Sequence, residues 1–237
     1  MTQDPYAAPQ SNIQTSPSGP GTPGTGTFDI GLAMSEAWQN TIQNIGPMIG
    51  VLIVGTIVSL LMSVTIIGIF LGLPVLFYGL TKFLLNTHDG RCQFSDLFSG
   101  FSNYGAILGR MLVFALLMMV IFIGAASIQY IGRFIESESL IMIGGLFEIV
   151  FQLVIGVRLY WAGYFLVDRD LTATEAIKAS WEASRGNWLK LFLLSLMMAV
   201  VTFLGMLALG VGLLVAIPMT YMMFVSSYRQ CAGTPAS

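Results

Sequence analysis

The chain has 237 residues, of which 55 % are hydrophobic and only 9 % are charged, and its mean hydropathy is +0.79. An ordinary soluble domain is about 25 % charged, so this composition predicts an integral membrane protein. The net charge of −2 and the dispersed lysines and arginines exclude a basic nucleic-acid interface.

The first 27 residues differ in composition from the rest of the chain. They hold five of the nine prolines and no lysine or arginine. Such a segment cannot bury enough apolar surface to fold, so residues 1–27 are predicted to be a disordered cytoplasmic tail. It lacks the charged and apolar regions of a cleavable signal peptide. Residues 28–230 are assigned to a transmembrane domain and residues 231–237 to a short C-terminal tail.

Long apolar stretches follow this tail. Residues 45–81 and 191–228 contain no charged side chain, and each is long enough for two crossings, because about 20 residues span a bilayer. Residues 111–128 and 140–167 supply one span each. The sequence therefore predicts an all-α membrane protein with six transmembrane helices.

The positive charges predict the orientation of these spans. Nine of the ten lysines and arginines, all except Arg133, lie near the connections between spans two and three or four and five, or after span six. Cytoplasmic flanks collect lysine and arginine, so both termini are expected in the cytoplasm.

Residues 173–185 are expected to form a short helix with two different faces. One face carries residues at i, i+4, i+7 and i+11, which are Ile177, Trp181, Ser184 and Trp188. Thr172 and Glu175 have the spacing of a capping box, and Gly186 is suited to end the helix. A helix of this kind lies in the membrane interface instead of crossing it.

The same pattern occurs 143 residues earlier. Ala33, Trp38 and Asn44 correspond to Ala176, Trp181 and Asn187, and Asp29 stands where Thr172 caps. Residues 94–105, FSDLFSGFSNYG, contain a weaker third copy. These matches predict three repeats of an interfacial helix followed by a transmembrane hairpin. The interfacial anchors would be Trp38, Trp181, Trp188, Asn44 and Asn187. The alternative is that a six-span protein gathers amphipathic linkers without any repeat.

Residues 167–188, VDRDLTATEAIKASWEASRGNW, resemble a recurring segment of uncharacterised bacterial six-span integral membrane proteins. A similar membrane domain precedes the catalytic domain of some bacterial glycerophosphodiester phosphodiesterases. The resemblance implies a six-span fold in the bacterial inner membrane for about residues 28–230. It implies no activity, because it concerns the fold and not a site.

The polar residues give little support for an enzyme. His88 is the only histidine and lacks an evident acid-base partner, so a structural or neutral role is expected. Asp168 and Asp170 could hold a metal, but helix capping is favoured because no third ligand is evident. Cys92 and Cys231 have no metal-ligand spacing. We therefore expect no catalytic residue, metal or cofactor.

Glu148 is the strongest candidate for an intramembrane polar site. It lies inside the fourth predicted span, with Gln152 one turn further on. An ionised carboxylate there must be paired by another helix or neutralised. Two interpretations remain open, a proton-linked or cation-binding group in a cavity and a polar contact between helices.

Pro74 and Pro218 are candidate helix breaks in spans two and six. They stand at nearly equivalent positions of the two hairpins. Paired breaks can mark a transporter site, because they free carbonyl groups as ligands. They can equally be kinks that neighbouring helices stabilise.

The leading hypothesis is a non-enzymatic membrane protein that interacts with membrane lipids or serves as a scaffold at the cytoplasmic face. A protein partner and a second copy of the chain both remain open as binding partners. The alternative is a transporter of small solutes or lipids that uses Glu148 and the proline-containing helices.

Overall fold

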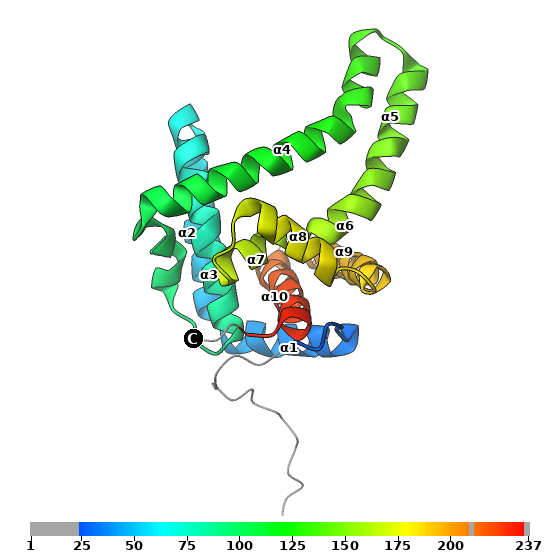
Figure 1. Ribbon diagram of the computed structural model, residues 1–237. Coiled ribbons are helices and arrows are strands. Elements are labelled where there is room, and N and C mark those ends of the chain that lie inside the picture. The colour runs from blue at the N-terminus through cyan, green and yellow to red at the C-terminus, as the bar shows by residue number, and fades with distance from the viewer. Residues whose placement is uncertain (1–23, 209–210, 235–237) are drawn as a thin grey trace, which may run out of the picture.

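The computed structural model describes residues 24–208 and 211–234, which form helices joined by short connections (Figure 1). No strand occurs in these residues, and the predicted all-α class is confirmed. The α-helices are α1 (Ile30–Gln43), α2 (Ile45–Ser63), α3 (Leu73–His88), α4 (Tyr104–Phe134), α5 (Glu138–Phe151), α6 (Val157–Leu159), α7 (Ala162–Asp168), α8 (Ala173–Ala183), α9 (Trp188–Leu207) and α10 (Leu213–Ala232). The π-helices are η1 (Gly68–Gly72) and η3 (Gln152–Gly156), and η2 (Phe94–Phe101) is a 3₁₀-helix.

Five segments are long and apolar enough to cross a membrane, which makes this a multi-pass protein. They are Ile45–Ser63, Gly68–His88, Tyr104–Phe134, Glu138–Asp168 and Trp188–Leu207. The predicted sixth span, α10, is not among the segments found in the described chain. Its second half carries a polar run, residues 226–230, which lowers its hydropathy. The count of six spans therefore stays a prediction.

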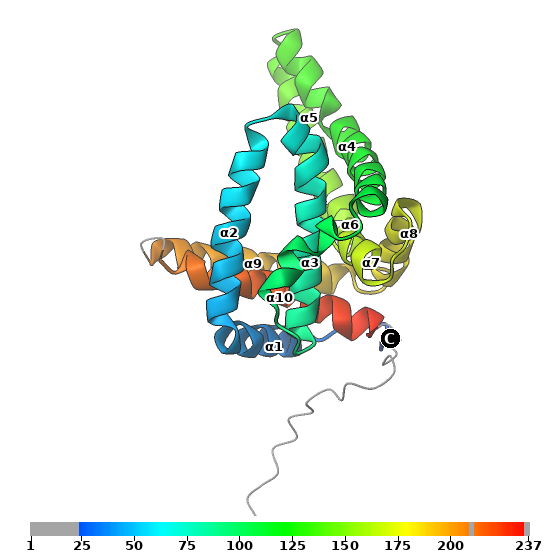
Figure 2. The same cartoon turned by 90° about the vertical axis from the view of Figure 1, so that its left-hand side faces the viewer.

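Three helical hairpins point in different directions (Figures 1 and 2). The α2–α3 hairpin stands upright in both views, the α4–α5 hairpin leans away from it, and the α9–α10 hairpin runs across it. The short helices pack against the hairpins. The helix α1 contacts α2 and α10, and α8 contacts α4, α6 and α7.

The buried core surrounds α10. Met222, Met223, Val225 and Tyr228 of α10 are fully buried, and Trp161 packs with them in the same cluster. In contrast, large apolar side chains are exposed along α2, α4 and α5. Such exposure would be costly in water but suits helices surrounded by lipid.

The ends of α1 and α8 follow the sequence signals. Asp29 Oδ1 accepts a hydrogen bond from the Leu32 N–H at 2.8 Å, and Thr172 with Glu175 forms the predicted capping box. Gly186 adopts φ +80°, a conformation that favours glycine after a helix. The third predicted amphipathic segment differs, because η2 is a 3₁₀-helix.

The first described residues are held against the end of α10. The N–H groups of Thr25 and Gly26 donate to the carbonyl oxygens of Gln230 and Cys231, at 3.1 and 3.3 Å. Residues 24–27 of the predicted tail are therefore ordered, and residues 1–23 lie outside the described chain. At the other end, α10 continues to Ala232, past the predicted boundary at residue 230.

Candidate functional site

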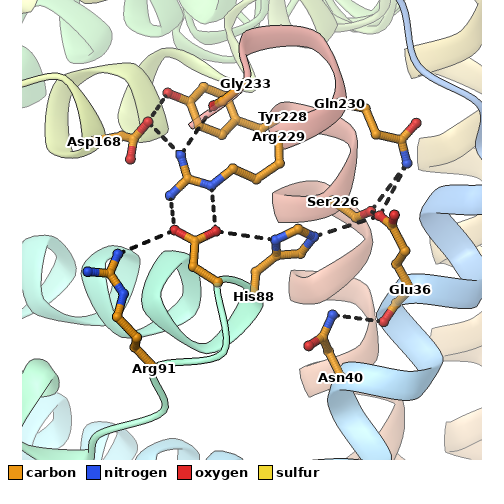
Figure 3. Close-up of polar contacts among 11 residues, drawn as sticks. Glu36, Asn40, His88, Arg91, Asp168, Ser226, Tyr228, Arg229, Gln230 and Gly233 are labelled. Carbon is orange, nitrogen blue, oxygen red and sulfur yellow. Dashed lines mark hydrogen bonds and ion pairs between the residues drawn. The ribbon is translucent and has the colours of Figure 1, made fainter. Parts of the chain in front are cut away.

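A buried arginine near the C-terminal ends of α3, α7 and α10 joins these three helices (Figure 3). Arg229 of α10 donates to both carboxylate oxygens of Asp89, with Nε–Oδ1 at 3.0 Å and Nη2–Oδ2 at 2.7 Å. Its Nη1 donates to Asp168 Oδ2 at 2.7 Å, and the Tyr228 hydroxyl donates to the same oxygen at 2.7 Å. The buried charges are thus compensated by a bidentate pair and a second carboxylate.

His88 extends this charge cluster towards α1. Its Nδ1 lies 3.5 Å from Asp89 Oδ1, and its Nε2 lies 3.7 Å from Glu36 Oε2. Glu36 Oε2 also accepts hydrogen bonds from the Ser226 hydroxyl and, at 3.3 Å, from Gln230 Nε2. The cluster therefore connects α1, the end of α3, α7 and α10.

Two carboxyl groups of the cluster have lowered pKa values. Burial raises the pKa of Glu36, but the His88 imidazole, the Ser226 hydroxyl and the Gln230 amide lower it to a greater combined extent. Burial likewise raises the pKa of Asp89, and His88 together with Arg229 brings it below its usual value. Both carboxylates are therefore stabilised in their charged form.

This cluster was only partly predictable from sequence. His88 was expected to be structural or neutral, and the structure places it between Glu36 and Asp89. Asp168 was expected to cap a helix, whereas it pairs with Arg229, and Asp170 pairs with Arg110. The two aspartates thus face different arginines and do not form one metal site. The available signal was the position of Asp89, Asp168 and Arg229 at ends of apolar runs.

An apolar groove of about 660 Å³ opens between α2, α3 and α10. Its volume falls within the range of about 300–1,000 Å³ that is usual for ligand sites. Most of its wall is aliphatic or aromatic. The polar groups on the wall are the hydroxyls of Thr56, Ser59, Ser63 and Tyr221. The groove can hold an apolar chain and offers few hydrogen-bonding groups.

The predicted intramembrane site does not meet this groove. Glu148 is half-buried on α5, and Gln152 is exposed at the start of η3. Neither side chain makes a hydrogen bond or ion pair with any other residue in the described part of the chain. Both residues are also absent from the groove wall.

The two prolines occupy different places. Pro218 lines the groove, but α10 continues through it from Leu213 to Ala232, so it does not break the helix. Pro74 lies in the first turn of α3, directly after the π-helix η1, and does not line the groove. Proline has no N–H group to pair and is tolerated in the first turn of an α-helix.

The predicted tryptophan anchors have unequal surroundings. Trp38 of α1 is 52 % exposed. The guanidinium of Arg158 packs over the ring of Trp181 of α8, 4.6 Å from the ring centre. Trp188 Nε1 donates to the carbonyl oxygen of Leu153, in η3, at 3.0 Å. Trp181 therefore attaches the amphipathic α8 to the fourth span, and Trp188 attaches the start of α9 to it.

Asn44 and Asn187 make matching hydrogen bonds. Asn44 Nδ2 donates to the Asn40 carbonyl at 3.0 Å, and Asn187 Nδ2 donates to the Ala183 carbonyl at 3.1 Å. Each asparagine directly precedes a long apolar helix. Asn187 is completely buried, so it fastens a helix turn and does not face lipid.

Residues 95–235 match the family described as Domain of unknown function (DUF7847), and the match covers more than half of the chain. No curated protein and no solved structure shows a significant match. The comparisons thus support an uncharacterised family, and the suggested relation to the membrane domain of glycerophosphodiester phosphodiesterases is not supported.

Proposed function

This chain belongs to the DUF7847 family, and we propose that it is a non-enzymatic membrane protein that binds a lipid chain in the groove between α2, α3 and α10. The groove carries the proposal. Its wall is mainly apolar, and its hydroxyl groups offer few sites for hydrogen bonding. An acyl chain needs such a wall, whereas a polar solute would leave its own hydrogen bonds unmade.

The hydroxyl groups of α2 reinforce this choice of ligand. Thr56 Oγ1 donates to the Leu52 carbonyl at 2.7 Å, and Ser63 Oγ donates to the Leu60 carbonyl at 2.8 Å. Their hydrogens are therefore used within the helix, and only oxygen lone pairs face a ligand. This arrangement reduces the polarity of the groove wall.

The proposed location is the bacterial inner membrane, with both termini in the cytoplasm. The uneven distribution of lysine and arginine supports this orientation. The hydrogen bonds from Thr25 and Gly26 to the end of α10 also support it, because they require both ends of the domain to lie on one side.

The proposed architecture has six spans in repeated units, with α10 as the sixth. Matching features support the repeat at an offset of 143 residues. Asp29 and Thr172 cap α1 and α8, and Asn44 and Asn187 make equivalent hydrogen bonds before α2 and α9. Each unit would place an amphipathic helix before a hairpin.

Native mass spectrometry of the protein extracted with its lipids tests the groove. Gly55 lines the groove, and an added Cβ would meet only Leu97 Cδ1 at 4.0 Å, so Gly55→Leu should fill the space without a backbone clash. Gly124→Leu is the matched control, since a Cβ at this exposed position of α4 meets nothing within 4 Å. We expect retained lipid in the wild type and control and its loss in Gly55→Leu.

Two results would contradict the lipid proposal. One is equal lipid retention in Gly55→Leu and the wild type. The other is a wild type that carries a stoichiometric protein partner and no lipid, which would instead favour a scaffold.

One observation favours a transporter as the second candidate. Glu148 is half-buried in a candidate span with no partner among residues 24–208 and 211–234, and it adjoins η3. Intramembrane acids and π-helices both occur often at functional sites. Movement of a fluorescent phospholipid across vesicle membranes should then slow at least about tenfold in Glu148→Gln, a loss that corresponds to one stabilising interaction. Unchanged movement would remove this candidate.

A further inference from the structure

Arg158 of α6 is half-buried and differs in its contacts from the buried Arg229. Arg229 is bound by two aspartates. In contrast, Arg158 Nε is buried and has no hydrogen-bond partner in the described structure, and its side chain forms no ion pair there. A buried charged donor without an acceptor is unfavourable. An anionic acceptor from outside the described chain would relieve this cost.

The guanidinium of Arg158 is nevertheless held in place. It lies 4.6 Å from the centre of the Trp181 ring, in a cation–π contact. The helix that carries Trp181 is fixed to the backbone of α6, because Ser180 Oγ donates to the Arg158 carbonyl at 2.7 Å. The ring contacts one face of the guanidinium, so the Trp181 contact uses none of its N–H donors. A planar fork of N–H donors fits the oxygens of a phosphate group.

The position of Arg158 along the fourth span matches the phosphate layer of a bilayer. The span Glu138–Asp168 has 31 residues, more than a crossing requires. Counted from Glu138, about 20 residues or 30 Å of helix cross the hydrocarbon core, which brings the chain to Arg158. Trp181 and Trp188 join the span beside this point, through Arg158 and Leu153. Tryptophans are enriched at this depth.

We propose that the Arg158 guanidinium, supported by Trp181, binds a phosphate group, supplied by a phospholipid headgroup at the membrane surface. The proposal is independent of the groove between α2, α3 and α10, since Arg158 does not line that groove. Free phosphate offers the same chemistry, and the two sources are separated experimentally.

Binding is measured on the full-length protein in detergent by thermal unfolding and native mass spectrometry. The probes are phosphatidylglycerol, diacylglycerol with the same acyl chains, and inorganic phosphate. The variants are Arg158→Gln and the control Arg185→Gln, which removes an exposed arginine of the same region. Phosphatidylglycerol should bind Arg158→Gln about ten- to a hundredfold more weakly, as expected for loss of a hydrogen bond to a charged group. The control should bind like the wild type.

The probes identify the source of the phosphate. Binding of phosphatidylglycerol without response to inorganic phosphate supports the headgroup, and an Arg158-dependent response to inorganic phosphate alone would overturn it. Diacylglycerol binding equal to phosphatidylglycerol would overturn the phosphate site altogether. If Arg158→Gln does not fold, Arg158→Lys retains the charge without the planar fork. Weaker binding in that variant supports the proposal, and unchanged binding contradicts it. Gly55→Leu should leave the binding of phosphatidylglycerol at Arg158 unchanged. Unaltered lipid retention in Gly55→Leu would therefore contradict the groove proposal alone.

Discussion

Replacement of Arg229 by glutamine should remove the ion pairs that connect α10 to Asp89 and Asp168. Arg229 makes three hydrogen bonds to Asp89 and Asp168, and its side chain is 6 % exposed. The side chains of Asp89 and Asp168 are only 13 % and 5 % exposed. Arg229→Gln therefore leaves the buried Asp168 carboxylate without its ion-pair partner, and leaves Asp89 with only His88 and the exposed Arg91 beside it.

The expected loss is large compared with that of an exposed pair. Removal of one partner from a buried ion pair costs about 3–5 kcal/mol, because the remaining charge is neither hydrated nor paired. Arg91 offers a matched control. It contacts the same Asp89 at 3.7 Å, but its side chain is 69 % exposed, so Arg91→Gln should cost less than about 1 kcal/mol.

Reversible unfolding in mixed micelles would measure these free energies. A third variant combines Arg229→Met with Asp89→Asn and Asp168→Asn, and it should be more stable than Arg229→Gln because no buried charge remains unpaired. Equal losses in Arg229→Gln and Arg91→Gln would refute the reasoning. So would a triple variant that is no more stable than Arg229→Gln.

Three further predictions concern pH, helix capping and close packing. The lowered pKa values of Glu36 and Asp89 contribute stability that is fully present above their unfolded values of 4.5 and 3.8 and is lost as pH falls through the folded values. Unfolding measured from pH 6 downwards should show this loss, and a flat profile in the wild type would contradict it. Thr172→Ala should lower the free energy of unfolding by about 1 kcal/mol, because the hydroxyl caps α8, and Thr172→Ser should retain most of it. Gly79→Ala should cost about 1–3 kcal/mol, since the new methyl group would collide with a backbone carbonyl of η2, whereas Gly109→Ala has open space and should be neutral or stabilising. The same unfolding assay measures both, and equal stability of the two glycine variants would count against the close approach.

The sequence determined the class of the protein and the features that depend on near neighbours. Low charge and long apolar runs predicted an all-helical membrane protein, and five candidate spans agree with that class. The cap at Asp29, the capping box at Thr172 and the turn at Gly186 were also predictable. Each of these depends on groups within a few residues of one another, so local spacing carries the information.

Only the tertiary structure decided which distant side chains meet. Arg229 finds Asp89 across 140 residues and Asp168 across 61, and the groove combines walls from α2, α3 and α10. Arg158 illustrates the same limit, because sequence alone gave no reason to place it on Trp181. The hairpins have similar hydropathy, and hydropathy contains no information about the angles between them. Those directions depend on side-chain packing around α1, α8 and α10, which decides whether a charge is buried, paired or left to bind a ligand.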